Sequence, residues 1–95
     1  MKISWTSKAL FDYYQNLDYL LMEWGEQVAI DFADHVNTII EIICEYPDIF
    51  PLSSYRGIRK AVINKRITLY YKADEDTITL MRFWNNYKDP EKREL

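Results

Sequence analysis

Basic side chains concentrate in one segment of the chain, residues 56–72, and these side chains have the clearest potential for chemistry. The segment holds six of the twelve Lys and Arg residues and no Asp or Glu. Cations at this density can contact phosphate groups at short range. The segment is therefore the first candidate for a functional surface, and contact with a polyanion is the chemistry that it could support.

The two halves of the chain carry charges of opposite sign. Residues 1–50 hold two Lys and nine Asp or Glu, whereas residues 51–95 hold ten basic residues and six acids, which gives −7 and +4. A net charge of −3 and a pI near 5.1 argue against long-range attraction to a polyanion. Salt screens the distant acids within about 10 Å at ~0.1 M ionic strength, so the basic surface keeps its capacity for short-range phosphate contact.

Several other kinds of site find no support in the sequence. Cys44 is the only Cys and cannot form an internal disulfide, and the single His35 has no partner motif, so we expect no metal site and no small-molecule cofactor. Gly25 and Gly57 are too few for a glycine-rich phosphate loop. The sequence has no apolar run of about eighteen residues and no recognisable signal peptide, which predicts a cytoplasmic protein without a membrane partner.

The first half of the chain predicts a short strand and two helices. We expect the strand at residues 2–5, with Thr6 or Ser7 capping the helix that follows. That helix has an apolar stripe, which we expect to face the core, at spacings of four, three, four and three: Leu10, Tyr14, Leu17, Leu21 and Trp24, with Phe11 and Leu20 widening it. Gly25 ends it, and a second helix is predicted over residues 26–45, with an apolar inner face of Ala29, Phe32, Val36, Ile39, Ile40 and Ile43. The short connection predicts an antiparallel hairpin.

The second half of the chain predicts an antiparallel meander. Residues 55–63, 66–73 and 77–84 are rich in β-branched and aromatic side chains and are separated by polar turn signals. Alternation along the middle strand assigns Ile67, Leu69 and Tyr71 to one face and the residues between them to the other. The fold class is therefore α+β, with the helix hairpin packed on three strands. We expect one domain over residues 1–95, with a polar tail from about residue 88.

In this order of elements the chain resembles the RelE/ParE superfamily of bacterial toxins from type II toxin-antitoxin systems. The resemblance covers nearly the whole chain and depends on the order and spacing of several short features. These are Trp5, Ala9, Ala29, Phe32, the loop from Pro47 to Pro51, Gly57-Ile58-Arg59, the sequence Ile-Thr-Leu-Tyr-Tyr at 67–71, and Phe-Trp-Asn-Asn-Tyr-Lys-Asp-Pro at 83–90.

The resemblance implies a toxin that inhibits growth and that a cognate antitoxin holds silent by wrapping it. RelE-like members cut mRNA on the ribosome with basic side chains and often a Tyr, whereas ParE-like members poison DNA gyrase and are not nucleases. Cleavage requires cations near the scissile phosphate and a group that takes the proton of the 2′-hydroxyl.

Six residues are candidates for the site of an mRNA endoribonuclease: Arg59, Arg82 and Tyr87 for catalysis, and Lys60, Lys65 and Lys88 for contact with the substrate. Arg59 follows the Gly and apolar residue with which the meander of the family begins. Tyr87 stands where relatives commonly have an Arg. It is either an acid, base and stacking residue or the mark of a member without cleavage activity.

Other interpretations remain open. Arg59 could be a structural residue paired with a carboxylate on the acidic helices. The chain could be a gyrase poison or an inactive toxin-fold protein that works only through protein contacts, which the acidic helices favour, whereas the basic segment favours RNA. A third hypothesis is a small α+β interaction domain unrelated to toxins.

Overall fold

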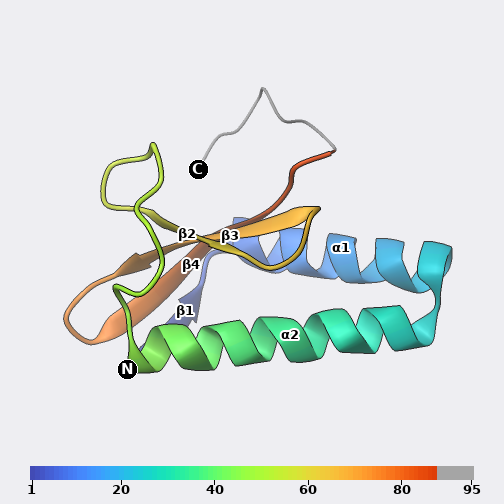
Figure 1. Cartoon of the computed structure of the whole chain (residues 1–95), viewed down its shortest axis with the longest axis horizontal. Helices are drawn as coiled ribbons and strands as arrows, with labels where there is room; N and C mark the ends of the chain where they lie inside the picture. Colours follow the sequence, from blue (N-terminus) through green and yellow to red (C-terminus); the bar gives the residue numbers. More distant parts are fainter. Residues whose placement is uncertain (88–95) are drawn as a thin grey trace.

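The structure, a computed structural model, describes residues 1–87 and contains two helices and a mixed four-stranded sheet (Figure 1). The elements, in chain order, are β1 (Lys2–Trp5), α1 (Ser7–Trp24), α2 (Glu26–Glu45), β2 (Arg59–Val62), β3 (Ile67–Ala73) and β4 (Thr77–Asn85). The polar tail expected from about residue 88 lies outside the described residues. None of the helices described is long and apolar enough to cross a membrane.

The sheet has the strand order β1-β4-β3-β2. Strands β2, β3 and β4 pair antiparallel as the predicted meander, and β1 joins β4 in parallel, a pairing that the sequence did not reveal. Strand β2 is shorter than predicted because residues 55–58 form a turn, in which the Ile58 N–H donates to the Tyr55 carbonyl at 3.1 Å. The predicted α+β class and its meander are confirmed.

The helix hairpin is also confirmed, with both of its predicted boundary residues. The Thr6 side chain accepts a hydrogen bond from the Ala9 N–H at 3.0 Å, so Thr6 caps α1. Gly25 alone separates the helices and has a φ of 96°, a backbone conformation that residues other than glycine rarely adopt. The two helices therefore run antiparallel to each other (Figure 1).

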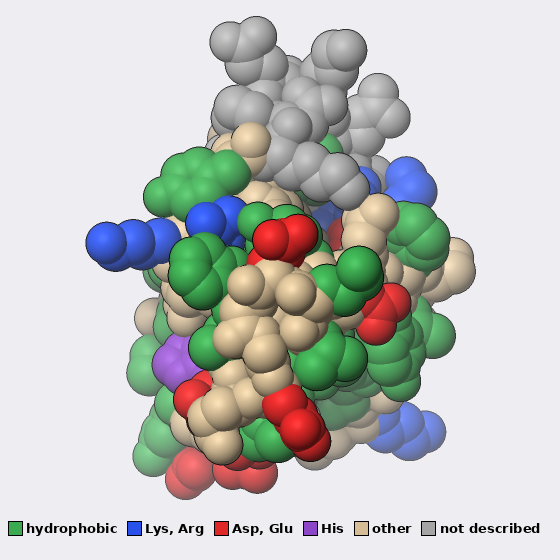
Figure 2. All heavy atoms as spheres, turned by 90° about the vertical axis from the view of Figure 1, so that its right-hand side faces the viewer, with side chains coloured by type: hydrophobic (Ala, Val, Ile, Leu, Met, Phe, Trp, Pro, Cys, Tyr) green, Lys and Arg blue, Asp and Glu red, His purple; other side chains and the backbone are tan. Residues whose placement is uncertain are grey.

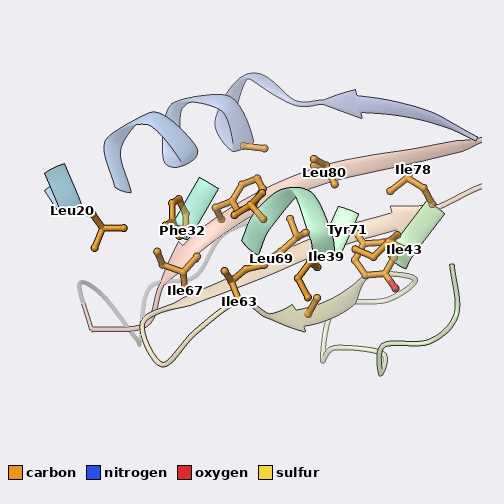
Figure 3. Packing of buried hydrophobic residues seen from close by; sticks show 14 of the residues in the cluster. Leu20, Phe32, Ile39, Ile43, Ile63, Ile67, Leu69, Tyr71, Ile78 and Leu80 are labelled. Carbon is orange, nitrogen blue, oxygen red and sulfur yellow. The ribbon is translucent and has the colours of Figure 1, made fainter. Parts of the chain in front are cut away.

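The core lies between α2 and one face of the sheet. The buried residues of α2 are those predicted, apart from a half-buried Ile40: Ala29, Phe32, Val36, Ile39 and Ile43. They pack with Ile67, Leu69 and Tyr71 of β3. Figure 3 shows this packing for Phe32, Ile39 and Ile43. Alternation had assigned these three residues to one face, and the structure confirms that assignment.

The predicted inner face of α1 is wrong. Four of its five stripe residues are exposed, with Tyr14 at 55% and Trp24 at 60%, and only Leu17 packs partly against the core. The buried residues of α1 are Ala9, Asp12, Asn16 and Leu20, of which only Leu20 belongs to the predicted face, and Phe11, which was predicted to widen that face, is exposed. The helix is rotated by about one residue, or roughly 100°, from the orientation that hydrophobicity predicts.

The reason for this rotation is the edge of β4. Strand β1 pairs only with residues 77–80, so the edge of β4 beyond Leu80 has no neighbouring strand. Two polar side chains of α1 take the place of that strand: Asp12 Oδ2 accepts from the Phe83 N–H at 3.1 Å, and Asn16 Nδ2 donates to the Phe83 carbonyl at 3.3 Å. Buried backbone groups need such partners, so polar residues occupy the inner face of α1.

Candidate functional site

The two arginines predicted to be catalytic lie on opposite faces of the sheet. Arg59 is paired in register with Tyr71, whose side chain is in the core, whereas Arg82 is paired with Tyr70, whose side chain points to the other face. Lys60 is also paired with Tyr70. The sheet therefore brings Lys60 and Arg82 to one face, which we call the outer face, and separates both from Arg59.

Arg59 holds the loop that follows α2. Its Nη1 donates to the Phe50 carbonyl at 2.8 Å, and its Nη2 lies 3.4 Å from Asp48 Oδ1. The same loop accepts a hydrogen bond of 2.7 Å from the Tyr71 hydroxyl to the Pro47 carbonyl. Burial raises the pKa of Tyr71 above its ordinary value of 10.0, and this effect outweighs the positive charge of Arg59, which acts to lower that pKa. Arg59 thus has a structural role, although its carboxylate partner is in the loop and not on a helix.

Arg82 is held by a buried carboxylate on α1. Its Nε and Nη2 donate to the two oxygens of Asp12 at 2.6 Å and 3.0 Å, a bidentate arrangement that fixes the guanidinium. The guanidinium also lies 4.9 Å from the centre of the Trp84 ring. Asp12 therefore fixes the position of this cation and balances its charge, while 16% of the surface of the Arg82 side chain remains accessible.

The outer face carries a row of three polar side chains, one from each strand of the meander: Lys60, Tyr70 and Arg82. Tyr70 is buried and packs edge-on against Tyr55 with the ring centres 5.9 Å apart. Lys60 is exposed. At the usual strand spacing, the Cα atoms of Lys60 and Arg82 are roughly 10 Å apart. Lys60 and Arg82 could contact the same extended anion, one on each side of Tyr70.

Tyr87 lies near Arg66 at the end of the sheet where β3 begins. The centre of its exposed ring is 5.2 Å from the Arg66 guanidinium, which also lies 5.9 Å from the ring of Tyr19. Arg66 precedes Tyr70 by four residues, so this cluster is about 13 Å from the outer-face row along the strand. Lys65 is exposed in the turn beside Arg66, and Lys88 lies outside the described residues.

A groove runs between the first turns of α1 and the second half of β4. It has a volume of about 600 Å³ and is lined by side chains that include Phe11, Asp12, Asn16, Arg82 and Trp84. A shallower cleft of about 500 Å³ adjoins it and shares Ser7, Phe11 and Gln15. We call the two together the α1 groove. Among residues 1–87 no group of His, Cys, Asp or Glu side chains could hold a metal ion.

Sequence reasoning did not single out Asp12, Asn16 or Arg66. The signal for the first two was present: both are in helical phase with Ala9 and Leu20, which places two polar side chains on a face that must be buried. The phase alone could not identify what they contact, because Asp12 and Arg82 are 70 residues apart in the chain.

No protein-family model and no curated protein sequence matches the chain. Solved structures do. The chain is similar to the chromosomal ParDE toxin-antitoxin system from P. aeruginosa, with a TM-score of 0.75, 16% identity and coverage of 90% of this chain and 95% of that chain.

Two further structures have the same fold. The YoeB dimer from Staphylococcus aureus gives a TM-score of 0.65 at 16% identity over 88% of this chain and 94% of that chain. The E. coli DinJ-YafQ complex gives 0.59 at 14% identity over 90% and 93%. The fold that the resemblance implied is thus confirmed: the chain has the fold of these ParDE, YoeB and YafQ structures.

Proposed function

We propose that the chain is the toxin of a type II toxin-antitoxin system and that it inhibits growth by binding a protein target, in the manner of the ParE-like branch. The fold supports the toxin class, because the similar solved structures are toxins or toxin-antitoxin complexes. The proposal implies action in the cytoplasm, on DNA gyrase or another protein target. It needs no cofactor.

The separation of the candidate catalytic residues is the observation that carries this choice. A nuclease of this type needs cations and a proton acceptor around one phosphate, with the acceptor about 3 Å from the proton that it takes. Arg59 and Arg82 are instead on opposite faces of the sheet, and each is paired with a carboxylate. Tyr87 lies with Arg66. Residues 1–87 therefore do not assemble the three groups at one point.

Ribosome-dependent mRNA cleavage is the second candidate, and the outer-face row favours it. Lys60 and Arg82 flank Tyr70 on a surface that an RNA strand could cross, and Trp84 offers a ring for base stacking. In this candidate Lys65 contacts the substrate outside the row, and Lys88, which lies outside the described residues, stays a predicted contact. Catalysis would then require the Asp12 carboxylate to release part of Arg82, or Lys60 to supply the cation.

Both candidates include a cognate antitoxin. The toxin-antitoxin complexes among the similar structures support such a partner. So does the exposed apolar surface of α1, because a solvated patch of this kind marks a binding site more often than it marks an ordinary monomer surface.

Inducible expression in a bacterial host without an antitoxin tests the proposal. Growth, new 5′ ends across the mRNA pool, and double-strand breaks in DNA are measured together. The expected result is growth arrest with DNA breaks and without codon-phased 5′ ends. Lys60→Ala serves as the matched variant, because an exposed lysine of the outer-face row can be removed without disturbing the core.

The outcomes separate the two candidates. If the chain binds a protein target, Lys60→Ala leaves the arrest intact or weakens it without any change in RNA ends. Codon-phased ends that disappear in Lys60→Ala would establish the nuclease and overturn the proposal. Normal growth with an intact RNA pool would remove both forms of toxin activity in that host.

A further inference from the structure

The larger part of the α1 groove is lined along one side by Lys8, Phe11 and Gln15 of α1. These residues are three and four positions apart, so they share one face of the helix. Lys8 and Gln15 are exposed, and within residues 1–87 neither side chain makes an ion pair or a hydrogen bond. The volume of about 600 Å³ lies in the range of roughly 300–1,000 Å³ that is usual for small-molecule sites. A ligand there would meet a cation, an aromatic ring and an amide in a row.

We infer that this part of the α1 groove binds an adenine nucleotide, with its base at Gln15 and Phe11 and its phosphate at Lys8. A primary amide holds a donor and an acceptor side by side, which matches the amino group of adenine and the ring nitrogen beside it. The aromatic ring of Phe11 supplies a surface on which a base stacks. The inference goes beyond the proposed function and does not depend on it, because growth inhibition enters none of its steps.

The polar lining of the groove favours adenine over guanine. Guanine presents two acceptors on the same edge, and Arg or Lys is the side chain that pairs with them. The arginine of this groove is Arg82, whose Nε and Nη2 already donate to Asp12 at 2.6 Å and 3.0 Å. The other amides of the lining are Asn16 and Asn85, and the 3.5 Å between Asn16 Oδ1 and Asn85 Nδ2 makes only a weak bond, which a ribose hydroxyl can replace.

The charges along the groove set the direction of the nucleotide. Lys8 and Gln15 are seven residues apart, or about 10 Å along the helix, a separation that one mononucleotide can span. Asp12 balances Arg82, so Lys8 carries the unbalanced charge among the residues that line this part. Asp18 lines the adjoining part and lies beyond Gln15, toward the hairpin tip. Figure 2, which faces that tip, shows acidic side chains among hydrophobic ones. A phosphate is therefore attracted to the Lys8 end and repelled from the other.

Calorimetric titration of the full chain with AMP, GMP and adenosine tests the inference. AMP should bind, and GMP should bind about tenfold more weakly or less, because its edge does not match an amide. Adenosine should bind more weakly than AMP, and this difference should shrink as salt is added. In the isotope-labelled chain, AMP should shift the side-chain amide signals of Gln15 and Asn85 and leave that of Gln27 unchanged.

Two matched pairs of variants locate the site. Gln15 and Gln27 are both exposed, but Gln27 is on α2, where its Nε2 donates to Asp31 at 2.9 Å. Gln15→Ala should weaken AMP binding by about tenfold or more, whereas Gln27→Ala should leave it within about twofold. Lys8→Ala should lower the affinity for AMP to that for adenosine, whereas Lys2→Ala, which removes an exposed lysine of β1, should not. Circular dichroism checks that each variant is folded.

The contrary results are distinct. No heat and no amide shift with AMP at millimolar concentration would overturn the inference, as would equal affinity for AMP and GMP or equal loss in Gln15→Ala and Gln27→Ala. A short oligoadenylate, titrated in parallel, separates a free nucleotide from a base within a strand. Binding of the strand without any binding of AMP would also overturn the inference. Failure of the proposed function is recorded separately by the growth assay, to which no nucleotide is added.

Discussion

Asp12 on α1 satisfies three donors at once, and its removal is the sharpest test of how α1 is held against the sheet. Its carboxylate accepts from Arg82 Nε at 2.6 Å, from Arg82 Nη2 at 3.0 Å and from the Phe83 N–H at 3.1 Å. Asp12→Ala leaves the guanidinium and the backbone N–H without this acceptor. We expect a large loss of stability from a change of three heavy atoms.

The magnitude follows from the two groups left behind. An unsatisfied buried N–H costs about 1–3 kcal/mol, and removing one partner of a buried ion pair costs about 3–5 kcal/mol. The side chain of Arg82 is 16% exposed, so water reaches it in part, and we expect a total near the lower end, about 3–4 kcal/mol. A chain of this size has a stability of roughly 5–14 kcal/mol. The corresponding fall in Tm is about 12–30 °C.

Urea denaturation followed by circular dichroism and tryptophan fluorescence measures this loss. Asp18→Ala is the control, since Asp18 is an exposed aspartate on the same helix and its removal should change stability by less than about 0.5 kcal/mol. Asp12→Asn retains an acceptor for the Phe83 N–H and should fall between the two. If Asp12→Ala differed from Asp18→Ala by less than about 0.5 kcal/mol, the edge contact would contribute nothing measurable and our account of α1 would fail.

Three further changes test other parts of the fold in the same denaturation assay. Phe32→Ala should cost about 3–5 kcal/mol because the side chain is in the core; a much smaller loss would contradict the packing of α2. Gly25→Ala should cost about 1–3 kcal/mol, entirely through its φ of 96°, since the new Cβ meets nothing within 4 Å. Tyr71→Phe should cost about 1 kcal/mol at neutral pH by removing the hydrogen bond to Pro47. The pKa of Tyr71 is raised above 10.0, so the stability that its neutral phenol contributes is complete below pH 10.0 and is lost as pH rises through the folded-state pKa. As pH rises from neutral through that pKa, the free energy of unfolding should therefore fall less in Tyr71→Phe than in the unsubstituted chain. An equal fall in both would show that Tyr71 is not the cause of the alkaline loss.

Local patterns were sufficient for the elements themselves. Helix α2 was predicted with its full extent because its apolar residues recur at helical spacing and all meet one apolar surface. The middle strand β3 was predicted within one residue because its alternation separates Ile67, Leu69 and Tyr71 from their neighbours. In both cases the residues of one element carry enough information to orient it.

The positions of the candidate site residues depended on pairing between elements. Leu80 is paired with Tyr71 and faces the core, so strict alternation would place Arg82 on the core side as well. A register irregularity between Tyr70 and Tyr71 instead pairs Arg82 with Tyr70 on the outer face. The only mark of this irregularity in β4 is that the buried residues Ile78, Leu80 and Phe83 change their spacing from two to three, and strict alternation does not reveal the separation of Arg59 from Arg82.

The same polar contacts that hold α1 also create its exposed stripe. A rotation of about one residue, or roughly 100°, would turn Tyr14 and Leu21 toward the sheet. It would also remove Asp12 and Asn16 from Phe83 and turn buried Leu20 outward. The hydrogen bonds along the edge of β4 have fixed directions, whereas apolar contact has none, so the polar pair sets the rotation. The apolar stripe that the sequence predicts for the core is thereby left available to a partner. Helix α1 thus restrains Arg82 through Asp12 on one side and leaves apolar side chains exposed on the other.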